Sequence, residues 1–524
     1  MSRNWKEDCY LWEGRCQNAI LEWATTGPQT WGSLLVDSLA DGAEDLVILP
    51  YEYAGDLLLD EDLNVRRREA IPVAARDVKV KYPLFRTHSS VNNTAHTFTF
   101  RARREAFSPR NSGISQRSHP RGPATIIRDF MVRQKYRWPE ELDDIEDVER
   151  YRPGGFHPIQ ISDVLGGKYR VLHKLGCGGF STVWLARDST DQRLYAVKAL
   201  AADAPENELD IIRYLRNTVG AHRNVLSLHD YFTIQGPNGS HSCLVLPLLG
   251  PSIKQVRLSK VTMDVKRQAA TQIVAGLAHL HRGGVCHSDL THANVLFELR
   301  DVDRWSDSEV YQHFRAPNNA ELLCLDGSLP PPSAPRHIVE AINFRDIDPE
   351  LLSGNICIVD FGLSFLTECP PPGIPGTPLS FLAPELCFGA PRSPTNDVWA
   401  LGCLMFELCT NRVLFPLVFD RLDLLVGTIV DTLGRLPPHW EGCFVNQTDR
   451  AIKPGRKDFW YDSSFKPNRP LEHQIGKECP QLPEHQKQLL LQLLAGSLSL
   501  DPAQRLRATE MVSHPWFSQV ESTK

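Results

Sequence analysis

The residues of this 524-residue chain best suited to chemistry are one lysine, two aspartates and one asparagine, spread over three short motifs. Lys198 ends the run Tyr-Ala-Val-Lys, Asp289 and Asn294 belong to residues 287–294 (His-Ser-Asp-Leu-Thr-His-Ala-Asn), and Asp360 precedes Phe-Gly. Asp289 can accept a hydrogen bond from an attacking hydroxyl and orient it. Asn294 and Asp360 offer the hard oxygen ligands that Mg²⁺ prefers. These residue types in this order predict transfer of a phosphoryl group to a hydroxyl.

A glycine-rich segment precedes these motifs. It reads Leu175-Gly176-Cys177-Gly178-Gly179-Phe180-Ser181-Thr182-Val183 and lies between two expected strands. Glycines let backbone amides approach phosphate oxygens, which a Cβ would obstruct. A hairpin turn without any chemical role would explain the same glycines, so the segment alone is weak evidence. Cys177 is either a reactive thiol or, in the interpretation we favour, a small apolar residue.

Lys198 is expected to have an acidic partner. It ends a strand that otherwise faces the core, where an ammonium group is costly unless it is paired. Glu208, on the next expected helix, is the natural partner, and the pair would hold Lys198 against the phosphates of a nucleotide. A surface lysine without this role is the alternative.

Strand patterns come first in this part of the chain, and helical patterns follow. The expected strands cover residues 169–175, 182–187, 193–200, 225–234 and 243–248. The expected helices cover residues 206–216, 263–281, 397–409, 422–433 and 485–498. The coarse architecture is therefore a small strand-rich half followed by a larger helical half.

Residues 1–150 have a different character. Their apolar patches follow no sustained helical or strand period. Residues 101–121 are rich in Arg, Ser and Gly, and residues 140–149 are strongly acidic. We interpret both runs as solvated linker. A regulatory arm that touches the rest of the chain is the alternative.

Composition and charge exclude several classes of protein. The net charge of −6 lacks the basic excess of a duplex-binding protein, so we expect no direct nucleic-acid contact. No apolar stretch approaches the roughly 20 residues of a membrane-spanning helix, and the N-terminus lacks a secretory layout. The thirteen cysteines are scattered, without a C-x-x-C pair. We expect no membrane partner and an intracellular protein of the cytoplasm, the nucleus or both.

From residue 154 to residue 517 the chain resembles a eukaryotic protein kinase. Ala383-Pro384-Glu385 resembles the end of an activation segment, and His514-Pro515-Trp516-Phe517 the closing motif of the domain. Asp397 would brace the catalytic loop, and Arg505 would pair with Glu385. The resemblance implies an α+β, bilobal protein-kinase fold: a poorly structured, partly disordered N-terminal extension (1–150), a small β-rich N-lobe (151–250), and a larger α-helical C-lobe (251–520) with an insertion at about 298–355.

Two stretches resemble the SR-protein kinases in particular, and most closely their fungal branch. Residues 151–158 followed by Lys168-Tyr169 are similar to the entry of those kinases, and residues 180–185 to their phosphate loop. The long gap between Asn294 and Asp360 fits as well; its Pro330-Pro331-Pro332 and mixed charge predict an exposed, mobile loop. This resemblance implies protein substrates, Arg/Ser-rich ones among them, and we expect a monomer.

The resemblance also assigns roles around ATP and Mg²⁺. The catalytic residues would be Lys198, Glu208, Asp289 and Asn294, and the metal ligands Asn294 and Asp360. The nucleotide would lie against residues 175–183, Ala196, Lys198, Leu246, Pro247 and Leu249. Leu246 would form the back wall of the adenine pocket, the Pro247 carbonyl would accept from the adenine amine, and the Leu249 N–H would donate.

Three positions depart from the family pattern. Ser181 replaces the third glycine of the phosphate loop, and Thr291 replaces a lysine that stabilises the γ-phosphate. Losing one such donor costs about 10²–10³ in rate, unless His292 or another group substitutes. Ser288 replaces the arginine that reads a phosphorylated activation segment, so switching by phosphorylation there is not expected.

Two other functions remain open from the sequence. One is a small-molecule kinase of the aminoglycoside or choline type, against which Ala383-Pro384-Glu385 and Arg505 argue. The other is a pseudokinase scaffold, for which Ser181 and Thr291 argue. An Arg-rich substrate would need an acidic groove, but residues 437–481 show no clear acidic excess.

Overall fold

The computed structural model describes residues 135–440, 443–444 and 466–518, together with the backbone of six short strands between residues 33 and 99. The chain divides into two compact units, Met1–Arg133 and Gln134–Lys524. The first contains three antiparallel strand pairs, β1 (Ser33–Asp37) with β2 (Leu46–Pro50), β3 (Leu57–Leu59) with β4 (Val65–Arg67), and β5 (Lys79–Val80) with β6 (Phe98–Thr99). The basic run at 101–121 and most of the expected extension lie outside the described residues.

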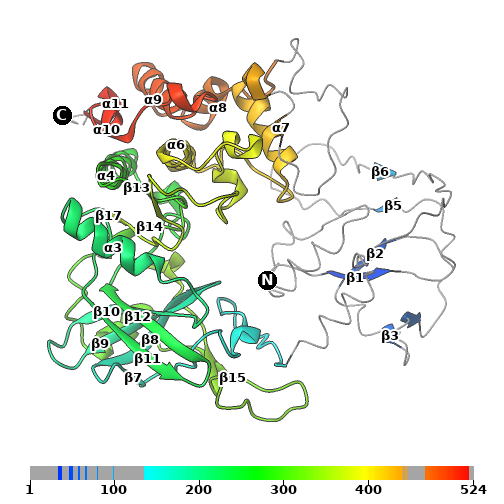
Figure 1. The fold of residues 1–524 in the computed structure, drawn as a ribbon, viewed down its shortest axis with the longest axis vertical. Coiled ribbons are helices and arrows are strands. Elements are labelled where there is room, and N and C mark those ends of the chain that lie inside the picture. Colours follow the sequence, from blue (N-terminus) through cyan, green and yellow to red (C-terminus); the bar gives the residue numbers. More distant parts are fainter. Residues whose placement is uncertain are drawn as a thin grey trace. The chain divides into compact units, whose positions relative to one another are not determined.

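The second unit begins with a six-stranded antiparallel sheet and one helix, drawn mainly in green in Figure 1. The elements are β7 (Val164–Leu165), β8 (Tyr169–Gly178), β9 (Ser181–Asp188), β10 (Leu194–Leu200), α3 (Asn207–Thr218), β11 (Asp230–Gly236) and β12 (Gly239–Pro247). The strand order is β11-β12-β10-β9-β8-β7. Helix α3 buries Leu209, Ile212 and Leu215, the residues at helical spacing in the sequence.

Most expected strands of this half are confirmed, but one begins later than predicted. The strand expected at 225–234 starts at Asp230. Before Asp230 the chain bonds to the segment that ends at Ile358 instead of to the sheet. The Leu226 N–H donates to the Ile358 carbonyl at 3.0 Å. Val225 and Leu226 are therefore apolar because they join the large core shared with the helical half, not because they form a strand of the sheet.

The following half is mainly helical. Its helices are α4 (Met263–Arg282), α6 (Pro394–Thr410), α7 (Leu422–Leu433), α8 (Leu471–Glu478), α9 (Glu484–Ser497), α10 (Ala508–Met511) and α11 (Pro515–Ser518). Two short strand pairs accompany these helices, β13 (Val285–Cys286) with β18 (Phe365–Leu366), and β14 (Val295–Leu299) with β17 (Leu352–Ile358). The four helices expected here are confirmed within a few residues, and α4 and α6 supply much of one large apolar core. Among the described helices, none is long and apolar enough to cross a bilayer.

The insertion between β14 and β17 is packed against the sheet, so the prediction of an exposed, mobile loop is wrong for most of it. It contains α5 (Asp307–Phe314) and the hairpin of β15 (Asn319–Glu321) and β16 (His337–Val339). Val310, Phe314 and Phe344 bury against Leu172 and Leu185 on the sheet. Residues 325–329 are exposed. The apolar residues of the insertion follow no simple period, which is why the sequence pattern missed them.

The interpretation of residues 140–149 as solvated linker is also wrong. The second unit begins at Gln134 rather than near residue 151. Leu142, Ile145 and Val148 are buried in a cluster with residues of the β15–β16 hairpin, such as Leu322. Apolar residues between the acidic ones thus attach this segment to the kinase-like unit, and the alternative of a contacting arm describes it better.

Candidate active site

Lys198 lies on the inward face of β10 and has two acidic partners. Its Nζ is 2.6 Å from Glu208 Oε2 on α3 and 3.1 Å from Asp360 Oδ1. Burial lowers the pKa of Lys198, but Glu208 and Asp360 outweigh burial and raise it above its usual value. The predicted Lys198–Glu208 pair is therefore present, and it presents a fixed ammonium group.

Asp360 is held in an unusual backbone conformation at the end of β17. Its φ is 64°, in the left-handed region, which is costly for a non-glycine residue. The next residue, Phe361, is fully buried and packs beside the His287 ring at 5.3 Å. Burial raises the pKa of Asp360, but Lys198 and the Gly362 N–H lower it further, so the pKa lies below its usual value and the carboxylate stays ionised.

Asp289 and Asn294 face each other across the catalytic loop. The Asn294 Nδ2 donates to Asp289 Oδ2 at 2.8 Å and to the Asp289 carbonyl at 2.9 Å. Burial raises the pKa of Asp289, as does the nearby Asp360 carboxylate, while the Thr377 hydroxyl is among the groups that oppose the rise. Asp289 Oδ1 is buried and accepts no hydrogen bond from the described residues. A carboxylate oxygen without a partner is the kind of group that accepts a hydrogen bond from a substrate hydroxyl.

The catalytic loop is braced from α6, as expected for Asp397. Its carboxylate accepts from the backbone N–H groups of His287 (2.8 Å) and Ser288 (2.7 Å), and from His281 Nε2 (3.0 Å). Ser288 has a φ of 67°. Two charge-assisted hydrogen bonds hold this strained turn. They thereby fix the backbone position of the next residue, Asp289.

The residues present fit a magnesium ion. Asn294 uses its Nδ2 for Asp289, which leaves its amide oxygen for a metal. All hydrogen bonds of the Asp360 carboxylate to described residues use Oδ1, and the side chain is 46% exposed. One amide oxygen and one ionised carboxylate oxygen are suitable hard ligands.

The glycine-rich segment forms the β8–β9 hairpin. Strand β8 ends at Gly178 and β9 begins at Ser181, with Phe180 60% exposed at the turn. A Cβ added at Gly176, Gly178 or Gly179 would meet no atom within 4 Å. Packing within the protein therefore does not require these glycines, which favours a requirement set by a ligand. Burial raises the pKa of the Cys177 thiol, in keeping with an unreactive residue.

The expected adenine residues lie where β10 and β12 meet. Ala196 is the register partner of Leu246, and both are buried. Pro247 ends β12 and is exposed, and Leu249 follows it in the connection between the two halves. Three of these residues thus lie on the strand of Lys198 or on its neighbour, and Leu249 lies in the connection that follows.

No cation from the catalytic loop replaces the missing lysine among the described residues. Thr291 is 2% exposed, and its hydroxyl accepts from the Ala293 N–H at 3.3 Å. The His292 Nδ1 lies 2.8 Å from Glu407 on α6, and its ring meets Phe381 edge-on. The Glu407 carboxylate thus holds the His292 ring against α6.

Two residues near the site were not expected from the sequence. Asn207, at the start of α3, donates to the carbonyl of Ser364 at 2.6 Å and lies 3.4 Å from those of Phe361 and Gly362. It therefore ties the helix that carries Glu208 to the segment that follows Asp360. Thr377 interacts with Asp289 from the activation segment. Neither residue type stands out in a sequence, because the role comes from neighbours distant along the chain.

A third unexpected feature is a buried ion pair beneath the phosphate loop. Glu146 and Lys174 are both almost fully buried and in contact, and the Tyr151 hydroxyl donates to Glu146. Lys174 Nζ also donates to the Val339 carbonyl of β16 at 3.0 Å. Since Lys174 is two residues before Gly176, this Glu146–Lys174 brace joins the phosphate-loop strand to both the N-terminal flank and the insertion.

The end of the activation segment is fixed by the expected ion pair. Arg505 Nη1 and Nη2 each lie 2.6 Å from an oxygen of Glu385. Both side chains are buried, and the bidentate geometry is the strong form of this contact. Because Arg505 also donates to the Thr395 carbonyl of α6 at 3.1 Å, the pair holds residues 383–385 beside that helix.

Comparison with known proteins agrees with this geometry. Residues 169–318 and 337–517 match the protein kinase domain. The chain is 28% identical to the serine/threonine-protein kinase SRPK of Physarum polycephalum over 412 residues, which cover 72% of this chain and 93% of that protein. It is 33% identical to the kinase SKY1 of Saccharomyces cerevisiae over 176 residues (30% of this chain, 24% of that protein), and 30% identical to human SRSF protein kinase 3 over 173 residues (30% of each). The chain therefore belongs to the protein kinase family, as a serine/threonine-protein kinase with relatives among the SR-protein kinases.

Proposed function

We propose that this protein transfers the γ-phosphoryl group of ATP to serine hydroxyls in Arg/Ser-rich proteins. The observation that carries the proposal is one connected network of four side chains. Lys198 contacts Asp360, Asn294 contacts Asp289, and the two aspartates influence each other's charge. An ammonium group, an amide and two carboxylates, the groups that phosphoryl transfer requires, therefore lie in two contacting pairs that neighbour each other.

The chain's own groups do three things in this reaction. Lys198 and the amides of the β8–β9 turn hold the phosphates, and the Lys198–Glu208 pair keeps the ammonium in place. Asp289 Oδ1 accepts the hydrogen bond of the serine hydroxyl and so orients its oxygen toward the γ-phosphorus. A bond forms between that oxygen and phosphorus, the bond to the β-phosphate oxygen breaks, ADP leaves, and the hydroxyl proton passes to Asp289.

Magnesium, held by Asn294 and Asp360, would neutralise charge on the phosphates. The fit of these two residues supports this assignment, since each has an oxygen that accepts no hydrogen bond from the described residues. Asp360 is ionised at neutral pH because Lys198 and the Gly362 N–H lower its pKa.

A protein acceptor is favoured over a small molecule. The Glu385–Arg505 pair fixes an activation segment, and Thr377 of that segment reaches Asp289. Such a segment lies where a peptide would present its hydroxyl. The Arg/Ser preference rests on the similarity to SRPK and to SRSF protein kinase 3.

A substrate panel tests the proposal. Full-length protein with Mg-ATP would be offered three serine peptides of equal length: one Arg/Ser-rich, one with acidic flanks and one with proline after serine. Kanamycin and choline serve as small-molecule acceptors. We expect the Arg/Ser peptide to be phosphorylated with the highest kcat/KM. Preference for another peptide would contradict the substrate class, and phosphate on a small molecule alone would contradict the protein-kinase assignment.

A further inference from the structure

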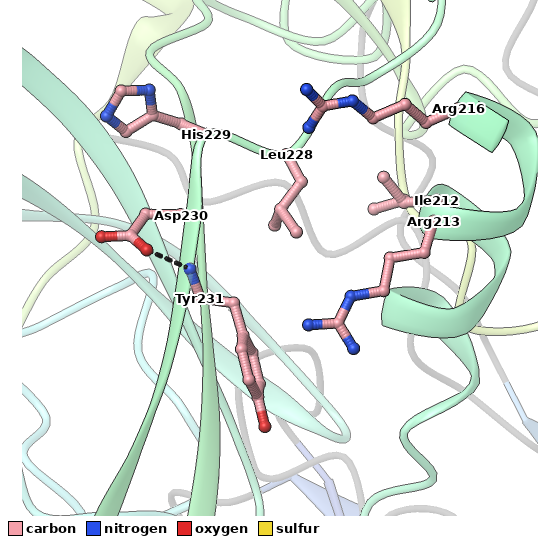
Figure 2. Close-up of a pocket in the computed structure, with 7 residues that line it drawn as sticks. All are labelled: Ile212, Arg213, Arg216, Leu228, His229, Asp230 and Tyr231. Atoms are coloured by element: carbon pink, nitrogen blue, oxygen red, sulfur yellow. Dashed lines mark hydrogen bonds between the residues drawn. The ribbon is translucent and has the colours of Figure 1, made fainter. Parts of the chain in front are cut away.

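Two histidines lie together where the segment before the sheet meets β12. His157 belongs to that segment, and His241 lies on β12 as the register partner of Ile234 on β11. Their ring centres are 4.9 Å apart, and the ring planes are inclined by 51°. Figure 2 shows the other end of β11, as far as Tyr231, beside a small pocket, so this histidine pair is a separate feature.

His241 presents a nitrogen lone pair inside the protein. The residue is fully buried, and its Nδ1 lies 3.0 Å from the Leu200 carbonyl. Only a protonated nitrogen can donate to a carbonyl, and burial lowers the pKa of His241, so Nδ1 holds the one proton of a neutral ring. Nε2 is then an acceptor, and it is buried without a hydrogen bond to the described residues. A ring held through its other nitrogen by a backbone carbonyl is the usual arrangement of a metal-binding histidine.

His157 supplies a second nitrogen of the same kind. Its Nδ1 is buried and has no hydrogen-bond partner among the described residues. Burial, together with the neighbouring His241, lowers the pKa of His157 to about 4, so this ring is also neutral near pH 7. Buried polar atoms are nearly always paired. Two adjacent imidazoles that each leave a buried nitrogen without a hydrogen bond therefore point to a ligand.

The turn between β11 and β12 leaves space next to the His157 nitrogen. A Cβ at Gly236 would lie 2.3 Å from His157 Nδ1 and 2.5 Å from its Cε1. The first distance is close to the roughly 2.0–2.1 Å of a zinc–nitrogen bond. Any other residue at position 236 would therefore place an atom at coordination distance from Nδ1, and glycine does not.

The same turn contributes a third buried acceptor. Asn238 is 3% exposed, and its Nδ2 donates to the carbonyls of Phe156 and Ser333 at 2.6 Å each. Phe156 directly precedes His157. The amide oxygen, Asn238 Oδ1, is buried and accepts no hydrogen bond from the described residues. The turn and the segment beside it thus hold three buried acceptors that lack a donor.

The types of these atoms select the kind of cation. Neutral imidazole nitrogens suit zinc, copper and nickel, whereas magnesium and calcium prefer carboxylate and carbonyl oxygens. Among the described residues, the one group of three His, Cys, Asp or Glu side chains close enough to share an ion is Asp188, Asp191 and His229, so no carboxylate or thiol joins the histidine pair. The pair therefore suits a different ion from the one that Asn294 and Asp360 fit.

We propose that His157 Nδ1 and His241 Nε2 bind a divalent transition-metal ion such as zinc, with water or the Asn238 amide oxygen completing its coordination. The ion joins the segment before the sheet to β12 and so stabilises the folded unit. None of these residues belongs to the candidate active site, so the proposal stands independently of the proposed kinase function.

Zinc uptake by the full-length protein tests the proposal. The protein is treated with EDTA, transferred to a magnesium-free buffer and titrated with zinc chloride in a calorimeter. We expect the wild type to bind one more equivalent of zinc than His157→Gln or His241→Gln, because each substitution removes a ligand nitrogen. His473→Gln changes an exposed histidine and, as the control, should bind as the wild type. Equal uptake by the wild type and His157→Gln would overturn the proposal.

A spectroscopic measurement on the wild type does not depend on how the variants fold. The zinc X-ray absorption spectrum of the complex with one equivalent should show nitrogen neighbours at about 2.0–2.1 Å, with the multiple scattering of imidazole. Sulfur neighbours at about 2.3 Å would assign the zinc to cysteines and overturn the proposal.

Thermal unfolding tests the stabilising effect. One equivalent of zinc should raise the melting temperature of the wild type and leave that of His157→Gln unchanged, since an ion that binds the folded chain more tightly than the unfolded one stabilises it. Zinc binding at the two histidines without any rise in melting temperature would overturn the structural role of the ion.

Discussion

The catalytic loop places an aspartate without a complete set of hydrogen bonds beside a neutral threonine. Asp289 Oδ1 is buried and has no hydrogen-bond partner among the described residues. Thr291, two residues later, is buried and uncharged where a lysine was expected. The loop can therefore orient the acceptor, while the fixed cation at the phosphates comes from Lys198 on β10.

Restoring a lysine at position 291 should speed the transfer. A lysine there would add a cation for the γ-phosphate, and one preorganised donor is worth about 10²–10³ in rate. We expect Thr291→Lys to raise kcat at least about tenfold with little change in the KM for ATP. Steady-state kinetics on the Arg/Ser peptide measure this, with Thr291→Ala as the control that should keep the wild-type rate. An unchanged kcat in Thr291→Lys would mean that another cation already serves the γ-phosphate.

The charged residues of the site could be predicted from the sequence, and the two neutral polar residues that support it could not. Lys198 and Glu208 were expected to pair because an inward lysine needs an acid, and Asp397 was expected to brace the catalytic loop. Asn207 and Thr377 are ordinary polar residues until the chain folds. Their roles depend on carbonyls and a carboxylate that lie far away in sequence.

At the scale of elements, the strands and helices with a regular apolar period were the predictable ones. Helix α3 shows its buried residues at helical spacing, and β10 is an uninterrupted buried run. Residues 135–150 and the insertion are irregular, with short elements and turns, so their buried residues have no period to detect. They could be recognised only from their packing against the sheet.

The Glu146–Lys174 brace should support both stability and nucleotide binding. Replacing Glu146 with Gln leaves a buried ammonium group without its carboxylate, which costs about 3–5 kcal/mol of the free energy of unfolding. We expect Glu146→Gln to lower the melting temperature and raise the KM for ATP, because β8 leads into the phosphate loop. Calorimetry and ATP titration measure the two effects.

Two further variants distinguish loss of the Glu146–Lys174 ion pair from a non-specific effect of substitution in this segment. Glu141→Gln changes an exposed acid of the same segment and should behave as the wild type. The double variant Glu146→Leu/Lys174→Met removes both charges and should recover much of the stability. A Glu146→Gln protein with unchanged melting temperature and KM would show that the pair does not support the loop.

At the scale of the whole kinase unit, the insertion joins its two halves a second time. Both flanking strands, β14 and β17, belong to the helical half, yet α5 between them packs on the sheet. Arg187 of β9 bonds Asp307 at 2.9 Å, and the Leu194 N–H donates to the Asp303 carbonyl at 2.8 Å. Relative movement of the halves is therefore constrained by more than the connection after β12.

Buried histidines should make this unit sensitive to acid. Burial lowers the pKa of His157 and of His173 to about 4, and a histidine in the unfolded chain titrates near 6.5. Between these values the unfolded chain binds more protons than the folded one, so the stability is complete above pH 6.5 and declines as the pH falls toward 4. Melting temperatures from pH 7.5 to 4.5 measure this decline.

A variant with both histidines replaced identifies the groups responsible. His157→Gln/His173→Gln should show a flatter dependence of melting temperature on pH between 6.5 and 4.5 than the wild type. The two proteins are compared by the slope of melting temperature against pH. Their absolute melting temperatures are not compared, because substitutions at buried positions also alter packing. An identical slope in both proteins would assign the acid sensitivity to other groups.

The most direct test of the account is phosphate transfer by full-length protein from γ-labelled Mg-ATP to an Arg/Ser-rich protein. The account predicts labelled serine with the wild type and with Asp420→Asn, an exposed control. It predicts no label with Asp289→Asn or Asp360→Asn, although both should still fold. Labelling by Asp289→Asn at the wild-type rate, or no labelling of any protein by the wild type, would contradict it.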